Sequence, residues 1–181
     1  MDKNTLRKFN IYITEQHMKG FQFGKTSLSI VILTAMIFSS PLVAKNEANG
    51  KLASISKQVG KGSWTIVEAW HHKCKICMSS MPAMIKSIGT YPNAKVIGVS
   101  LDGDVKIAQR VIREHGINFP TIMSNVKEFD TYVQKTAKKK LTGVPTFLIF
   151  SPKGKLVAFQ SGKITPKQLK DFINKQKRVS K

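Results

Sequence analysis

The sequence has few acidic residues, with 10 Asp and Glu against 30 Lys and Arg and a formal net charge of +20. Most of this charge follows residue 44, where 25 basic and 8 acidic residues remain. A chain this basic attracts phospholipid head groups, acidic proteins or nucleic acid. Because the lysines are scattered and no nucleic-acid motif is present, we expect no binding of nucleic acid. The densest run, at residues 138–140, is interpreted first as a solvated basic face, and contact with an anionic membrane surface is the alternative.

The sequence also lacks an apolar run long enough to span a bilayer comfortably, which takes about 20 residues. The run at residues 28–38 has 11 residues and is preceded by Lys19, as in the apolar region of a secretory signal. We therefore predict that residues 1–44 are a signal peptide cleaved after Ala44, with Met18 as an alternative start. An uncleaved membrane anchor and a buried helix are the alternatives for this run.

Cysteine is scarce, with two residues, Cys74 and Cys77. No second CxxC or CxxH motif is present to complete a zinc site. Cysteines three residues apart on a helix lie on neighbouring turns and can close a disulfide. The pair is either a structural disulfide or a redox-active thiol pair, and its spacing favours the second interpretation.

Hydrophobic periodicity and capping residues predict alternating strands and helices after a polar linker at residues 45–50. The order β-α-β-α-β-α-β-β-α indicates a layered α/β sheet with an antiparallel hairpin near its end. In chain order we expect a strand at 64–70, a helix from Cys74 to about Ile88 broken by Pro82, a strand at 96–99, a helix from Asp104 to about His115, a short strand at 119–123, a helix at 126–137, strands at 146–150 and 156–159, and a helix from Pro166 to about Lys177.

The CxxC motif follows a predicted strand and opens a predicted helix. A thiolate at Cys74 would be favoured by the positive end of the helix dipole and by free backbone N–H groups. Lys73 and Lys75 add positive charge on both sides of it. Cys77 lies about one turn further in and is more shielded. The pattern therefore predicts Cys74 as the nucleophile and Cys77 as the resolving thiol.

Two segments carry a family resemblance. Residues 67–82, VEAWHHKCKICMSSMP, resemble the active-site region of thioredoxin-like proteins, and most closely the exported TlpA/ResA-like thiol-disulfide oxidoreductases. Residues 143–150, GVPTFLIF, resemble the cis-proline loop and following strand of that family. Residues 99–145 resemble its extra helix–strand insertion. The resemblance covers residues 51–178 and implies a thioredoxin-like domain with a central mixed sheet flanked by helices.

The resemblance also implies roles for three further residues. Glu68, six residues before Cys74, matches a buried acid that could take the proton of Cys77 during resolution. Pro145 would be cis, and the backbone of Val144 would hydrogen-bond an extended substrate segment. No cofactor is implied.

The function that these residues predict is thiol-disulfide exchange in the periplasm with protein substrates and a membrane redox partner. The sequence departs from the family at Lys73, where Trp is usual, and at the Lys-Ile pair between the cysteines. The resemblance favours a reductant. Positive charge near Cys74 favours an oxidant instead, because it stabilises the thiolate.

Two rival functions use the same segments. A periplasmic copper(I) chaperone could use the thiols together with His71, His72 and the methionines Met78, Met81 and Met84. Methionines at helical spacing more often pack in a core. A redox-inert adaptor of the same fold would not need the intact CxxC. The leading prediction therefore includes no metal ligand.

Overall fold

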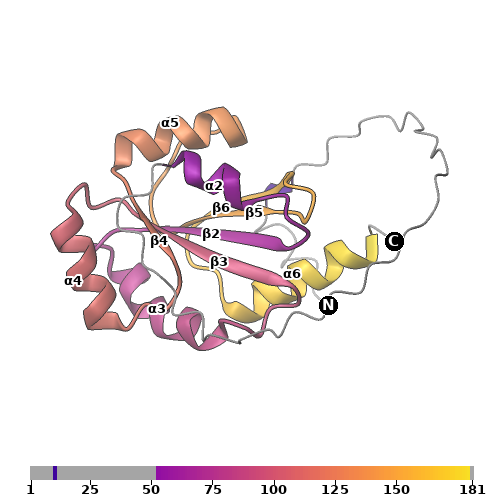
Figure 1. Ribbon diagram of the computed structural model, residues 1–181, viewed down its shortest axis with the longest axis horizontal. Helices are drawn as coiled ribbons and strands as arrows, with labels where there is room; N and C mark the ends of the chain where they lie inside the picture. Colours follow the sequence, from indigo (N-terminus) through magenta and orange to yellow (C-terminus); the bar gives the residue numbers. More distant parts are fainter. Residues whose placement is uncertain (1–9, 12–51, 180–181) are drawn as a thin grey trace, which may run out of the picture.

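The computed structural model describes residues 10–11 and 52–179 of the chain (Figure 1). Apart from residues 10–11, the predicted signal peptide at 1–44, the alternative start at Met18 and the linker at 45–50 lie outside the described residues. The described elements are, in chain order, β1 (Asn10–Ile11), α2 (Ala53–Gln58), β2 (Trp64–Trp70), α3 (Lys75–Ser87), β3 (Ala94–Ser100), α4 (Val105–His115), β4 (Thr121–Met123), α5 (Val126–Ala137), β5 (Thr146–Phe150), β6 (Leu156–Ser161) and α6 (Pro166–Val179).

The strands form one mixed sheet in the order β1-β6-β5-β2-β3-β4. Strands β2, β3 and β4 are parallel, while β5 runs antiparallel to both β2 and β6. The two-residue β1 pairs with β6 at the sheet edge. The α4–β4–α5 segment occupies the predicted insertion between β3 and β5. This architecture confirms the thioredoxin-like fold class.

Helices cover both faces of the sheet (Figure 1). Alternate side chains of β2 point to opposite faces, so Ile66 and Trp70 pack with α3, α4 and α6, and Val67 and Ala69 pack with α2 and α5. All seven residues of β2 are buried. The strand that leads into the CxxC motif is therefore covered along its whole length and lies in the middle of the sheet beside β5.

Several details differ from the sequence prediction. Strand β4 begins at Thr121 and not at residue 119, and β6 extends to Ser161 and not only to residue 159. Helix α3 continues through Pro82 instead of breaking there. Proline keeps a helical φ and removes one hydrogen bond, and burial of Cys77, Met81 and Met84 on one face of α3 offsets that loss. Helix α2 was not predicted from its six residues, and β3 is longer than expected at both ends.

The predicted helix ends are confirmed. Asp104 accepts hydrogen bonds from the backbone N–H groups of Lys106 and Ile107, and Gly116 ends α4 with a left-handed φ of 61°. Thr165 and Gln168 bond reciprocally at the start of α6, which is a capping box.

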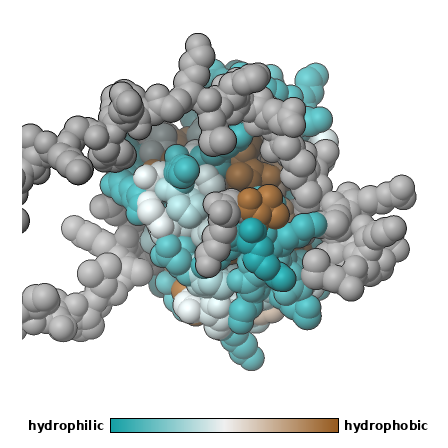
Figure 2. All heavy atoms as spheres, turned by 90° about the vertical axis from the view of Figure 1, so that its right-hand side faces the viewer, coloured by the Kyte–Doolittle hydropathy of each residue, from teal (hydrophilic) through white to brown (hydrophobic). Residues whose placement is uncertain are grey.

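Within residues 10–11 and 52–179, no helix combines the length and apolar character needed to cross a membrane. In Figure 2 the coloured residues of this face range mainly from teal to white, and a small hydrophobic patch, drawn in brown, lies among them.

Candidate active site

The sheet topology brings three distant segments together at one end of β2. Strand β2 ends at Trp70, directly before the loop that carries the CxxC motif. Strand β5 runs antiparallel to β2 and begins at Thr146, opposite Ala69, so the segment before β5 returns to the same end. Strand β3 runs parallel to β2 and ends at Ser100, opposite Trp70. Residues just outside these strands therefore meet around the two cysteines.

Cys74 and Cys77 are joined by a disulfide. Cys74 is the N-cap of α3, and its Sγ accepts a hydrogen bond of 3.1 Å from the backbone N–H of Cys77. Cys74 is half-buried, whereas Cys77 is fully buried in the core between α3 and the sheet. Attack from outside can therefore reach Cys74 more readily than Cys77, and the helix N-terminus stabilises negative charge on Cys74.

The loop before β5 faces the disulfide. The Val144–Pro145 peptide bond is cis, as the resemblance implied. The carbonyl oxygen of Val144 lies 3.5 Å from the Sγ of Cys74. The backbone N–H of Gly162 donates a 2.8 Å hydrogen bond to the carbonyl of Pro145, which fixes the loop against the end of β6. Val144 is the backbone position that lies directly beside the more exposed sulfur.

Glu68 lies inside the protein, on the face of β2 that also carries Ile66 and Trp70. Cys77 packs in the same core cluster as those two residues. The Glu68 side chain is 1 % exposed, and neither carboxylate oxygen has a hydrogen-bond partner among the described residues. Burial raises the pKa of Glu68 from 4.5 to about 7. Such a carboxyl group can hold or release a proton near neutral pH.

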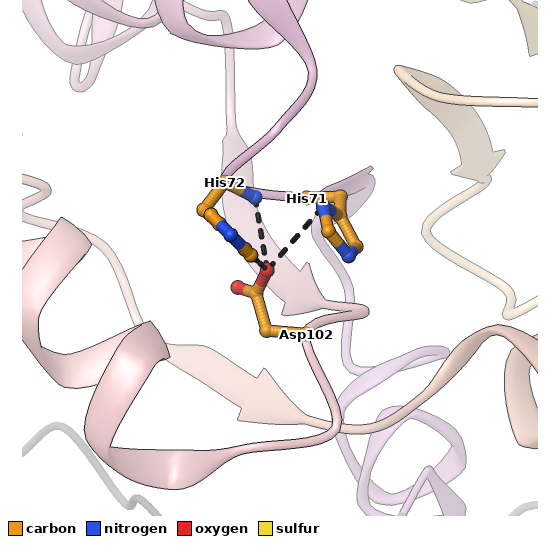
Figure 3. A group of neighbouring side chains, drawn as sticks. All are labelled: His71, His72 and Asp102. Atoms are coloured by element: carbon orange, nitrogen blue, oxygen red, sulfur yellow. Dashed lines mark hydrogen bonds and ion pairs between the residues drawn. The ribbon is translucent and has the colours of Figure 1, made fainter.

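A second polar group adjoins the CxxC loop (Figure 3). The Nδ1 of His72 lies 2.6 Å from Oδ1 of Asp102, and the backbone N–H of His72 donates to the same oxygen at 2.9 Å. The Ser100 hydroxyl donates to Oδ2 at 2.6 Å. Burial alone would raise the pKa of Asp102, but these hydrogen bonds and the nearby His71 hold it below its ordinary value. Asp102 is therefore a carboxylate that ties the loop to the end of β3.

His71 completes this group. Its ring stacks on that of His72 with centroids 4.6 Å apart, and its Nδ1 lies 3.5 Å from Oδ1 of Asp102. The backbone N–H of Lys73 donates to the same Nδ1 at 3.1 Å. Both imidazoles thus direct a nitrogen to one buried carboxylate.

The methionines of the copper hypothesis have different surroundings. Met81 and Met84 are buried in the core, and Met78 packs against it. The sulfur of Met84 accepts a hydrogen bond of 3.3 Å from the Tyr91 hydroxyl. This arrangement favours the packing role of these side chains over copper(I) binding.

Comparison with known proteins shows which family this chain belongs to. The model of the AhpC/TSA family matches residues 38–159, which is more than half of the chain. The chain belongs to the AhpC/TSA family. It is 26 % identical over 137 residues to the thiol-disulfide oxidoreductase ResA of Bacillus subtilis, covering 75 % of this chain and 72 % of ResA. This member of the family is thioredoxin-like and ResA-like, and its enzyme class is thiol-disulfide oxidoreductase.

Solved structures agree on the fold. A DsbF homologue from Corynebacterium diphtheriae matches with a TM-score of 0.55 and 21 % identity, over 64 % of this chain and 73 % of that one. StoA from Bacillus subtilis matches with a TM-score of 0.50 and 20 % identity, over 62 % and 84 % of the two chains. These similarities confirm the thioredoxin-like architecture of this AhpC/TSA family member.

The site includes two residues that the sequence did not single out. Asp102 lies 30 positions after His72, and a lone acid after a buried strand gave no specific signal. The strand order could have indicated it, because residues following neighbouring parallel strands meet at one edge. Ile76, between the cysteines, is 52 % exposed and places an apolar side chain beside the disulfide.

Proposed function

We propose that this protein is an exported thiol-disulfide oxidoreductase that reduces disulfides in protein substrates through Cys74 and Cys77. The observation that carries the proposal is the disulfide at the N-terminus of α3, with Cys74 facing the Val144 carbonyl at 3.5 Å. This arrangement combines the accessible sulfur of Cys74, the shielded sulfur of Cys77 and a backbone edge at Val144 for an extended substrate.

The exchange takes place in two displacements. The Cys74 thiolate of the reduced protein attacks one sulfur of the substrate disulfide, forming a mixed disulfide and releasing the other substrate sulfur as a thiolate. The Cys77 thiolate then attacks Cys74, which releases the second substrate thiolate and closes the Cys74–Cys77 disulfide. Two electrons pass from the cysteine pair to the substrate, and solvent protonates the released thiolates.

Glu68 acts in the second displacement. Cys77 is fully buried, so its thiol must lose a proton where water has little access. Glu68 points from β2 to the face of the sheet on which Cys77 packs, and it has a pKa of about 7, so its carboxylate can accept that proton at neutral pH. We assign Glu68 the role of general base in resolution.

The substrate segment docks on the loop before β5. An extended chain can hydrogen-bond to the backbone of Val144 as an added strand, with Pro145 holding the loop in place. Ile76 supports this docking because its exposed side chain offers an apolar contact beside the reacting sulfur. The substrate disulfide would then lie against Cys74.

A reductant outside the cytoplasm needs a source of electrons. Each cycle leaves the cysteine pair oxidised, and the periplasm is kept oxidising. We therefore propose a thiol-bearing membrane protein as the electron donor. After removal of residues 1–44, the 25 basic and 8 acidic residues leave a net charge of +17, which would hold the protein near anionic lipid and so near that donor.

The reduction potential of the pair tests the direction of transfer. It is measured by equilibrating the protein with glutathione buffers of defined ratio and quantifying the free thiols. A reductant should have a potential more negative than about −230 mV, in the range of thioredoxin. A potential of about −180 mV or above would instead indicate an isomerase or oxidant and would contradict the proposed direction.

A further inference from the structure

The thiol-exchange mechanism leaves His71, His72 and Asp102 without a role. They meet because β2 and β3 are neighbouring parallel strands that end in register, with Trp70 paired to Ser100. The histidines directly follow β2, and Asp102 follows β3 after one residue. Figure 3 shows both imidazole rings beside the Asp102 carboxylate.

We propose that His71, His72 and Asp102 form a binding site for a divalent transition-metal ion with the ligand preferences of Zn²⁺. Two imidazole nitrogens and one carboxylate oxygen are a donor set that such ions use, with water in the remaining position. One donor atom from each residue lies within 4.8 Å of the other two. Among the described residues, this is the one group of His, Cys, Asp and Glu side chains that converges in this way.

The distances fit an ion that takes the place of a proton. Two ligand atoms of a tetrahedral zinc site lie about 3.4 Å apart. The Nδ1 of His71 is 3.5 Å from Oδ1 of Asp102 and already matches this spacing. The Nδ1 of His72 is 2.6 Å away, which is a hydrogen-bond distance and requires a proton on one of the two atoms. An ion would release that proton to solvent and move these atoms apart by roughly 0.8 Å.

One existing contact competes with the ion. The Nδ1 of His71 accepts the backbone N–H of Lys73 at 3.1 Å, and its lone pair must turn from that donor to the metal. Lys73 is exposed, so water can bond the released N–H. This exchange lowers the affinity without blocking the site.

The carboxylate is already fixed for this purpose. The Asp102 side chain has no exposed surface, and the Ser100 hydroxyl and the His72 backbone N–H orient its two oxygens. Such outer contacts hold a ligand in position before an ion arrives. The side chains of His71 and His72 are 26 % and 25 % exposed, so an ion can reach them from solvent.

This site uses no sulfur and is therefore separate from both the thiol exchange and the copper(I) hypothesis. In the oxidised protein both cysteine sulfurs are held in the disulfide. Metal binding by the oxidised protein reports on the histidine–aspartate group without a contribution from thiolates. A failure of the metal proposal would leave the proposed oxidoreductase function untouched.

The test is titration of the untagged, oxidised full-length chain with Zn²⁺, followed by calorimetry and by competition with a chelator. We expect one Zn²⁺ per chain. Each of His72→Ala and Asp102→Asn should weaken binding by at least about a hundredfold, since it removes a ligand and the loss of an outer hydrogen-bond partner alone costs about 10- to 100-fold. The chain has two other histidines, His17 and His115. The control that replaces both with alanine should bind as the wild type does.

Two further measurements separate ligation from damage to the fold. His71→Ala removes a partly exposed ring, and it should weaken Zn²⁺ binding while leaving the metal-free thermal unfolding curve unchanged. Cu²⁺ bound to the wild type should show hyperfine coupling to two nitrogens, and to one in His71→Ala. Asp104→Asn is a neighbouring carboxylate control that keeps a good N-cap. The proposal is overturned by the absence of stoichiometric binding, by binding that survives the ligand substitutions, or by binding that is lost in the histidine control.

Discussion

At the scale of single residues, Glu68 links stability to pH. Its folded pKa of about 7 lies above its unfolded value of 4.5, so the folded chain binds more protons than the unfolded chain between these pH values. The contribution of Glu68 to the free energy of unfolding is therefore full below pH 4.5 and is lost as the pH rises to about 7. The shift corresponds to about 3 kcal/mol.

Glu68→Gln should remove this decrease in the free energy of unfolding with rising pH. Urea unfolding of the oxidised protein between pH 4.5 and 8.5 should show that the wild type loses about 3 kcal/mol more than the variant over this range. Glu114→Gln, which changes an exposed carboxylate, should keep the pH dependence of the wild type. An equal pH dependence in Glu68→Gln and the wild type would show that Glu68 ionises as an ordinary surface acid.

Individual residues differed in how well the sequence revealed them. Cys74 and Cys77 lie in a local motif whose chemistry depends on neighbours in the chain, so their placement at the start of α3 could be predicted. The Val144–Pro145 pair beside them begins 70 residues after Cys74 along the chain, and the place of Pro145 was implied by the family resemblance. Asp102 could not, because its partner His72 is brought to it by strand pairing. The substrate role of Val144 and the base role of Glu68 stay predictions.

At the scale of elements, the close approach of β3 to residues of β2 and β4 depends on the absence of a side chain at Gly98. A Cβ at this position of β3 would lie 2.7 Å from Oγ1 of Thr121, 3.0 Å from the Phe119 ring and 3.2 Å from Nε1 of Trp70. Gly98→Ala should therefore lower the free energy of unfolding by about 1–3 kcal/mol through overpacking.

A double-mutant cycle tests whether overpacking causes the destabilisation by Gly98→Ala. Thr121→Ala removes the atom nearest to the new Cβ, so it should be less destabilising in the Gly98→Ala background than in the wild type. Chemical denaturation of the four proteins gives the coupling free energy. Additive effects would show that crowding against Thr121 does not cause the destabilisation by Gly98→Ala.

Elements with strong local signals were predicted well. Asp104, Gly116 and the Thr165–Gln168 pair set helix ends by local hydrogen bonds or backbone conformation, and these ends are confirmed. Helix α2 has six residues and a weak signal, and its Ile55 is fully buried against the sheet. The continuity of α3 through Pro82 also depends on tertiary packing, which a sequence pattern does not contain.

At the scale of the whole molecule, the charge of +17 that remains after residue 44, from 25 basic and 8 acidic residues, should produce binding to anionic lipid. Sedimentation with vesicles that contain phosphatidylserine or phosphatidylglycerol should show binding that weakens strongly between 0.05 and 0.5 M salt, at roughly 1 kcal/mol per engaged lysine. Vesicles of phosphatidylcholine alone are the control, since they measure apolar insertion without surface charge. Binding that does not change with salt, or equal binding to both vesicle types, would show that charge does not cause the membrane binding.

The central claim is that Cys74 attacks and Cys77 resolves, and mixed-disulfide trapping tests it most directly. Cys77→Ala and Cys74→Ala are produced in the native host, and extracts are compared by non-reducing electrophoresis with mass spectrometry of shifted bands. Cys77→Ala should accumulate thiol-sensitive complexes through Cys74, because no resolving thiol remains, while Cys74→Ala should trap far less, because Cys77 is buried. Equal trapping by the two variants would contradict the assigned roles, and no complex from either would contradict the proposed thiol exchange.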